Sequence, residues 1–169
     1  MPSSSRARGS NRVTILNEAK NIRQIACEIL HRVESQKAYA DLLLDHHLRN
    51  AALKEADRAL LTELTYGTLR WRAKIDAKLE PFLNRSLAET DSFNRNLLRV
   101  TLYQLLFLDK IPAYAAVNEA VEIAKITQPR SASFVNGVLR NFLREKKQQE
   151  NGSAGSGSEG DQCQNAVVD

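Results

Sequence analysis

The residue types that usually catalyse reactions or bind metal ions are few in this sequence, and their spacing is unfavourable. Cys27 and Cys163 have neither a CxxC partner nor a histidine at metal-ligand spacing. His46 and His47 are adjacent, so on a helix they would point about 100° apart and could not share a metal ion. No serine lies in a GxSxG motif, and no histidine has an obvious acidic partner. The sequence therefore predicts neither catalytic residues nor a metal site.

Basic residues are the other group that could form a functional site, because their side chains bind phosphates. The net charge is +4, and the segment after residue 150 contributes acids but no base. A helix that begins near residue 20 would place several polar side chains on the flank outside its apolar face. They are Lys20, Arg23, Gln24, Cys27 and His31, with Arg12 just upstream. This strip suits a polyanion, and a simple solvated helix face is an equally good interpretation.

A second basic cluster surrounds the tryptophan of the chain. Arg70, Trp71 and Arg72 place an aromatic ring between two cations, an arrangement that can stack on and clamp a nucleotide. Trp71 also continues the apolar stripe of its helix. We therefore expect Trp71 to pack in the core.

Apolar residues recur at helical spacing through almost the whole chain between its two ends. The expected helices span residues 20–36, 39–48, 55–79, 93–108, 114–127 and 132–146. The residues expected to be buried are Ile25, Ile29, Leu64, Leu105, Val121 and Leu139, together with the amides of Asn118 and Asn136. Gly67 is expected to allow a close helix crossing. No segment alternates as a strand would, so the predicted fold class is an all-α helical bundle.

The two ends of the chain differ in composition from the part between them. Residues 1–17 are expected to form a flexible basic arm, and residues 149–169, rich in Gly and Ser, a disordered tail. The folded domain is then expected to span residues 18–148. No apolar run reaches the roughly 18 residues that a membrane span needs. Together with the missing secretory signal and the two unpaired cysteines, this predicts a cytoplasmic protein without a membrane partner.

Four segments make the sequence similar to a known family. The runs IPAYAAVNEAVEIAK at 111–125 and FVNGVLRNFLRE at 134–145 resemble the signature of the NusB family, which are RNA-binding helical proteins of transcription antitermination and rRNA metabolism. The runs DRALLTELTYGTLRWRAKID at 57–76 and LLRVTLYQLLFLDKIPAYAAVNEAVEIAK at 97–125 resemble one branch more closely. That branch is the N-terminal domain of the RsmB (Sun/Fmu) small-subunit rRNA cytosine-5 methyltransferases. The resemblance covers about residues 20–146.

This resemblance implies a NusB-like helical bundle of two packed three-helix subdomains. It also implies that RNA contacts the basic start of the first helix and neighbouring turns. Arg23 matches the arginine of the helix-one motif. The expected RNA-binding residues are Arg12, Lys20 and Arg23, with Arg70, Lys125 and Arg130 as less direct neighbours. The positions that match the structural signature are Gly67, Asp76, Asn118, Glu119, Asn136 and Gly137.

The sequence departs from the RsmB pattern after the helical domain. An RsmB enzyme continues into a Rossmann-like domain that binds S-adenosylmethionine and supplies two catalytic cysteines, and this sequence contains no such domain. We therefore expect no cofactor and no methyltransferase activity in this chain by itself. The leading hypothesis is an RNA-binding domain that positions rRNA for cytosine-5 methylation by a C-terminal methyltransferase domain. The alternatives are a stand-alone antitermination factor that binds boxA-like RNA with a ribosomal protein, or a non-RNA module that forms a homodimer or docks a partner.

Overall fold

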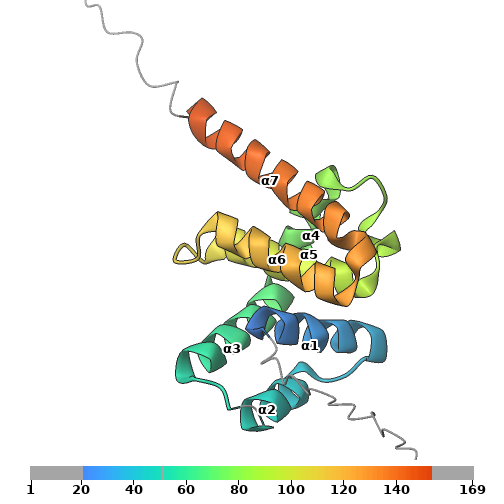
Figure 1. Cartoon of the computed structure of the whole chain (residues 1–169), viewed down its shortest axis with the longest axis vertical. Helices are drawn as coiled ribbons and strands as arrows, with labels where there is room; N and C mark the ends of the chain where they lie inside the picture. The colour runs from blue at the N-terminus through green and yellow to red at the C-terminus, as the bar shows by residue number, and fades with distance from the viewer. Residues whose placement is uncertain (1–20, 51, 154–169) are drawn as a thin grey trace, which may run out of the picture.

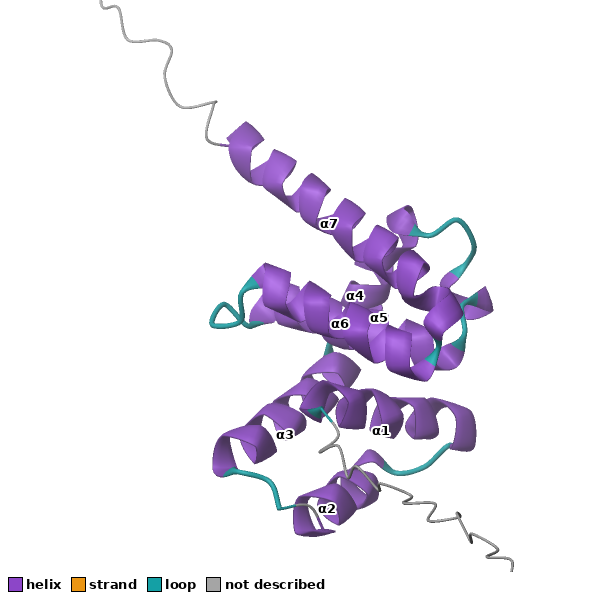
Figure 2. Ribbon diagram, viewed as in Figure 1, coloured by secondary structure: helices purple, strands orange, loops and turns teal. Residues whose placement is uncertain are grey.

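The computed structural model describes residues 21–50 and 52–153, and every regular element in these ranges is helical (Figure 2). The α-helices are α1 Ile22–Gln36, α2 Ala40–Asn50, α3 Glu55–Arg70, α4 Arg72–Leu79, α5 Ser92–Phe107, α6 Ala113–Thr127 and α7 Ala132–Ser153. Three short 3-10 turns accompany them: η1 Glu80–Phe82, η2 Leu87–Glu89 and η3 Pro129–Ser131. The predicted all-α fold class is confirmed.

The helices form two groups that pack against each other (Figure 1). Helices α1, α2 and α3 contact one another and form the N-terminal group, and α5, α6 and α7 form the C-terminal group. Helix α5 joins the two groups, because it contacts α1 and α3 on one side and α4, α6 and α7 on the other. The bundle of two packed three-helix subdomains is thus confirmed, with α4 as an added helix against α5.

Helix α5 can take this central place because nearly all of its faces are suited to burial. Leu98, Val100 and Leu102 are fully buried, and even Arg99 and Gln104 are enclosed. At its start, Asp91 accepts hydrogen bonds from the backbone N–H groups of residues 93 and 94 at 3.0 and 3.2 Å, which satisfies two free donors of the first turn. Surrounded on several sides, α5 supplies the core of both groups.

The helix predicted over 55–79 has the expected extent but is divided at Trp71. The backbone there departs from helical angles, with φ −99° and ψ 13°. The hydrogen bonds nevertheless continue, from the N–H of Trp71 to Gly67 at 3.0 Å and from the N–H of Ile75 to Trp71 at 2.9 Å. A Cβ on Gly67 would overlap the ring of Tyr103. The close crossing of α3 and α5 at this glycine is therefore confirmed.

Several predictions about burial are wrong. Cys27 is fully buried rather than on an outer flank, because α1 lies between α3 and α5 and buries a wider face than its isoleucines alone define. This burial raises the pKa of the Cys27 thiol. Val121 and Asn136 are only partly buried and Asn118 is exposed, because all three line a groove between α6 and α7.

Helix α7 is longer than predicted and includes residues 149–153 of the expected tail. Side-chain contacts one turn apart support these last turns: Gln149 Nε2 donates to Glu145 Oε1 at 3.0 Å, and Lys146 lies 4.0 Å from Glu150. The basic arm, Arg12, Lys20 and the tail after residue 153 lie outside the described residues. Among the helices of residues 21–50 and 52–153, none combines the length and the apolar composition needed to cross a membrane.

Candidate nucleic-acid interface

Arg23 lies in the first turn of α1, which Asn21 caps by accepting the N–H of Arg23 at 2.9 Å. Its Nε donates to Oε1 of Gln104 on α5 at 2.6 Å, and its Nη1 lies 2.5 Å from Oε2 of Glu119 on α6. The side chain is only 15% exposed. The prediction that Arg23 stands on an accessible outer flank is therefore wrong, because its guanidinium ties α1 to α5 and α6.

Three exposed cations, Arg70, Lys74 and Lys78, lie at the end of α3 and along α4, and we call them the basic face. Lys74 and Lys78 are four residues apart and share one side of α4, and Arg70 lies four residues before Lys74, at the end of α3. All three are exposed, and none forms an ion pair with another described residue. Arg72, on a different side, is paired with Glu34 at 3.1 Å and Asp76 at 3.8 Å.

Lys74 and Lys78 were not among the site residues predicted from the sequence. The signal that identifies them is their spacing from Arg70, which is visible in the sequence once 55–79 is taken as one helix.

Trp71 is 40% exposed beside the basic face, so the prediction of core packing holds for only part of its side chain. Its indole stacks on the Phe107 ring, with centroids 5.1 Å apart. Lys74 Nζ lies 5.2 Å from the Trp71 ring and 5.4 Å from the Phe107 ring. These contacts put an aromatic surface and an ammonium group in one place, as sites for single-stranded nucleic acid do.

A hollow next to Trp71 is lined by Glu63, Tyr66, Gly67, Leu69, Arg70, Trp71 and Tyr103. Both tyrosine hydroxyls there donate to carboxylates: Tyr66 to Asp41 Oδ1 at 2.6 Å, and Tyr103 to Glu63. Burial and then the bond to Glu63 raise the pKa of Tyr103 to about 12. The bond to Asp41 is the main cause that raises the pKa of Tyr66. Both phenols therefore remain uncharged at neutral pH.

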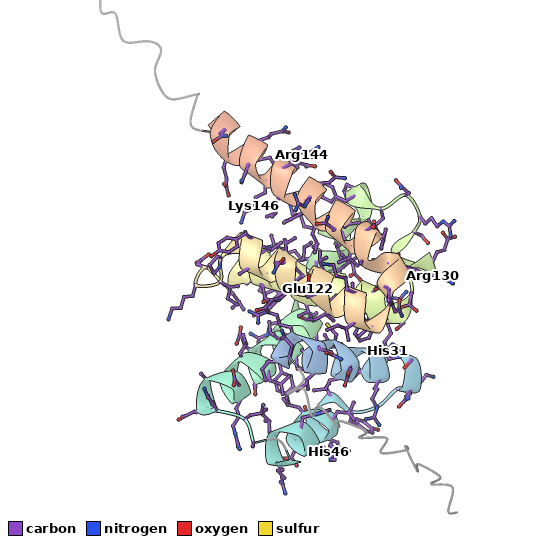
Figure 3. The ribbon with its side chains drawn as sticks, viewed as in Figure 1. His31, His46, Glu122, Arg130, Arg144 and Lys146 are labelled. Atoms are coloured by element: carbon purple, nitrogen blue, oxygen red, sulfur yellow. The ribbon has the colours of Figure 1, made fainter. Side chains whose placement is uncertain are left out.

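Lys125 and Arg130 lie away from the basic face. Lys125 pairs with Glu122 at 2.6 Å, and Arg130 lies in η3, the turn that leads into α7 (Figure 3). Gln128, close to both in the chain, bonds to Asn94 at the start of α5, whereas Trp71 stacks on Phe107 at its end. A helix of this length is about 24 Å long. The structure thus brings Arg23 and Arg70 to one end of α5, and Lys125 and Arg130 to the other.

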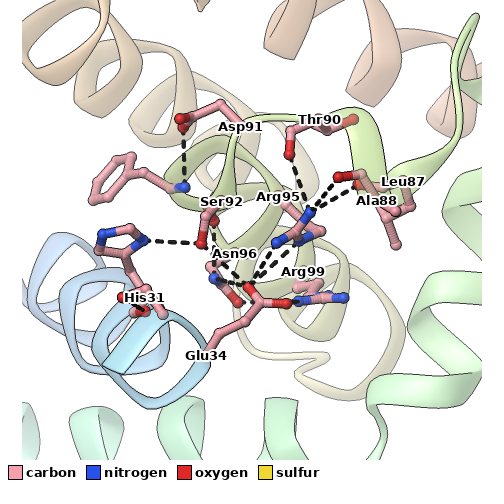
Figure 4. Close-up of polar contacts among 12 residues, drawn as sticks. His31, Glu34, Leu87, Ala88, Thr90, Asp91, Ser92, Arg95, Asn96 and Arg99 are labelled. Carbon is pink, nitrogen blue, oxygen red and sulfur yellow. Dashed lines mark hydrogen bonds and ion pairs between the residues drawn. The ribbon is translucent and has the colours of Figure 1, made fainter. Parts of the chain in front are cut away.

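Glu34 of α1 neutralises a further group of arginines, of which Figure 4 shows Arg95 and Arg99. Arg72, Arg95 and Arg99 each lie between 3.1 and 3.2 Å from the Glu34 carboxylate, and Arg99 also binds Asp76 at 2.7 Å. Burial alone would raise the pKa of Glu34. Bonds from Asn96 and the arginines outweigh burial and lower it to about 2. This cluster joins α1 to α4 and α5, so its cations are engaged within the fold.

The comparisons with known proteins agree with this architecture. The NusB family matches residues 20–144. The probable ribosomal RNA small subunit methyltransferase B of Bacillus subtilis (strain 168) is 46% identical over 126 residues, which cover 74% of this chain and 28% of that protein. The transcription antitermination protein NusB of Xanthomonas axonopodis pv. citri (strain 306) is 31% identical over 135 residues, which cover 79% of this chain and 85% of that protein.

A crystal structure of the antitermination factors NusB and NusE in complex with double-stranded RNA has the same fold. Its TM-score is 0.66 at 23% identity, and the match covers 78% of this chain and 99% of that chain.

The architecture defines an all-α domain of two packed three-helix groups. Within the described residues no group of three or more His, Cys, Asp or Glu side chains is placed to hold a metal ion. The match over residues 20–144 makes the assignment more specific: the chain belongs to the NusB family. It spans 28% of the length of the Bacillus subtilis methyltransferase that it matches.

Proposed function

We propose that this chain is the RNA-binding domain of an rRNA cytosine-5 methyltransferase and positions rRNA for a catalytic domain outside this sequence. The observation that carries the proposal is the basic face of Arg70, Lys74 and Lys78, whose exposed charges have no acidic partner among the described residues. The identity of 46% to a protein named as a small-subunit rRNA methyltransferase supports this assignment. Binding of S-adenosylmethionine and methyl transfer are assigned to the other domain.

The basic face would bind RNA by replacing the counterions of its phosphates. Lys20 immediately precedes the cap of α1, and Arg12 lies upstream in the sequence. We propose that both add phosphate contacts. Arg23 would hold the start of α1 in place and bind RNA only with the part of its guanidinium left exposed. Lys125 and Arg130 would contact a longer RNA at the opposite end of α5.

The test is the salt dependence of RNA binding by a variant with Arg70→Gln, Lys74→Gln and Lys78→Gln. A single-stranded fragment of small-subunit rRNA should bind this variant more weakly. The log-log slope of affinity against salt should shrink by about 2, at roughly 0.7 for each lost phosphate contact.

The matched control removes three exposed charges elsewhere, with Arg32→Gln, Arg49→Gln and Lys54→Gln, and should keep the wild-type slope. If the two triple variants bind alike, the basic face is not the RNA surface.

A second candidate function is a NusB-type antitermination factor that binds boxA-like RNA with a ribosomal protein. It is favoured by one observation: the Xanthomonas NusB is matched over 85% of its own length. The two functions differ in cooperativity. A stand-alone factor should bind boxA RNA more tightly in the presence of NusE, whereas a methyltransferase domain should prefer the rRNA fragment and ignore NusE. A chain that binds neither RNA but forms a dimer on gel filtration would instead be an interaction module.

A further inference from the structure

Three aromatic rings form a row where α3 meets α4 and α5. Phe107 lies in the middle, with its centroid 5.2 Å from the Tyr103 ring and 5.1 Å from the Trp71 ring. The Tyr103 end of the row is closed, because that ring packs on the backbone of Gly67. The Trp71 end is more open, since Trp71 is 40% exposed and its ring contacts no ring of a described residue other than Phe107.

Lys74 does not cover the open face of the indole. Its Nζ lies 5.2 Å from the Trp71 ring and 5.4 Å from the Phe107 ring, and the two rings are themselves 5.1 Å apart. Three nearly equal distances place the ammonium beside the pair, on the same side of the indole as Phe107. An ammonium over the opposite face would lie much farther from Phe107. The ammonium of Lys74 therefore leaves the face of Trp71 that points away from Phe107 uncovered. Trp71 is 40% exposed and lines a hollow with Arg70 and Tyr66, so part of its surface is accessible.

We propose that an unpaired nucleobase of single-stranded RNA stacks on this face of Trp71 as a fourth ring, while Arg70 and Lys74 bind the phosphates that flank it. The inference deepens the proposed function and rests on it.

The charges around Trp71 favour a nucleotide over an aromatic side chain of a protein partner. Arg70 precedes Trp71 in the chain, Lys74 lies beside its ring, and neither has an acidic partner among residues 21–50 and 52–153. The nearby carboxylate of Glu63 already accepts the hydroxyl of Tyr103. A nucleobase, which is flat and neutral and is flanked by two phosphates, matches this surface. A duplex does not, because its bases are already stacked and paired.

The chain offers a direct probe, because Trp71 is its single tryptophan. Tryptophan fluorescence is measured during titration with a short single-stranded RNA of mixed sequence, and binding is followed separately by the anisotropy of the same RNA carrying an end label. Stacking should quench the fluorescence with the same midpoint as the anisotropy change. An abasic RNA with the same number of phosphates should bind more weakly and leave the fluorescence unchanged.

Variants at Trp71 give a second measurement. Trp71→Leu keeps apolar contact with Phe107 but offers no aromatic face, so the affinity for single-stranded RNA should fall by about ten-fold or more. Trp71→Phe should recover most of this loss, and thermal unfolding would show that both variants are folded.

The outcomes separate this inference from the function on which it rests. RNA that changes anisotropy without quenching, together with wild-type affinity in Trp71→Leu, would overturn the stacking site and leave the RNA-binding function intact. Equal quenching by the abasic RNA would also overturn it. No anisotropy change with any RNA would overturn both, and binding of a protein partner in its place would reassign the surface.

Discussion

The guanidinium of Arg23 bonds to acceptors on two different helices. A substitution of Arg23 would therefore affect the stability of the fold as well as RNA binding. Gln104 holds one side through a 2.6 Å hydrogen bond, and Glu119 holds the other through a 2.5 Å ion pair. Hydrogen bonds to charged groups contribute roughly 1.5 to 3 kcal/mol when they are shielded from water. Loss of RNA binding on mutation of Arg23 would therefore combine a local electrostatic effect with a shift of α1.

Arg23→Glu should lower the free energy of unfolding by roughly 1 to 3 kcal/mol, because the new carboxylate would face Glu119 and leave Gln104 without its donor. Urea unfolding followed by circular dichroism measures this loss. The double variant Arg23→Glu, Glu119→Arg should recover part of the stability by restoring opposite charges. An unchanged urea midpoint for Arg23→Glu alone would show that the guanidinium is free in solution.

Glu34 should make the stability sensitive to acid. Its pKa lies at about 2 in the folded protein, against an ordinary value of 4.5. Because the folded pKa is lowered, the stabilisation is fully present above the ordinary pKa and is lost as the pH falls from there towards 2. The loss over this window should be on the order of 2 to 3 kcal/mol.

The measurement is the free energy of unfolding at a series of acidic pH values. Glu34→Gln should be less stable than wild type at neutral pH and should depend less steeply on pH. Asp45→Asn, which removes an exposed carboxylate paired only with Arg49 in the described structure, should retain the steep wild-type dependence. Parallel curves for wild type and Glu34→Gln would contradict this assignment.

At the scale of the elements, two glycines on helices have opposite roles. Gly67 lets the Tyr103 ring approach the α3 backbone, whereas a Cβ on Gly137 of α7 would meet nothing within 4 Å. Gly67→Ala should therefore cost about 1 to 3 kcal/mol through overpacking. Gly137→Ala should instead gain up to about 1 kcal/mol from helix propensity. Thermal unfolding of both variants gives the comparison, and a stabilised Gly67→Ala would mean that Tyr103 can move aside at little cost.

The helices themselves were predictable, because the apolar periodicity of each is strong and local. The contacts of their polar side chains were not. Arg23 finds its partner 81 residues away at Gln104, and no local pattern specifies that meeting. Trp71 continues an apolar stripe, yet it lies where α3 and α4 divide and the core covers only part of its ring. The basic face could have been found from the sequence, because its residues follow at four-residue intervals within the segment predicted as one helix.

At the scale of the whole molecule, α5 makes the two helix groups one folding unit. Each group uses α5 as a wall of its core, so neither can keep its buried surface without the other. Unfolding should then be a single transition. Circular dichroism, which follows all the helices, and the fluorescence of Trp71 should give coincident urea curves.

The variant Leu105→Ala tests whether the two helix groups unfold together. Leu105 is 8% exposed in the second half of α5, and its truncation should cost about 2 to 5 kcal/mol. Both signals should shift together by the same amount. A loss within about half a kcal/mol would contradict the central place of α5, and separate shifts would show that the groups unfold independently.

Helix α7 leaves the bundle after Lys146, whose Nζ still donates to the carbonyl of Leu105 at 3.1 Å. Residues 147–152 continue the helix and are exposed (Figure 1). A projecting helix sets both the distance and the direction of whatever follows it, because each residue advances the chain by about 1.5 Å along the helix axis and turns it by about 100° around that axis. Inserting one residue into this part of α7 would rotate any group attached at Ser153 by about 100° around the helix axis. A flexible linker in the same place would tolerate the insertion without a defined change in orientation.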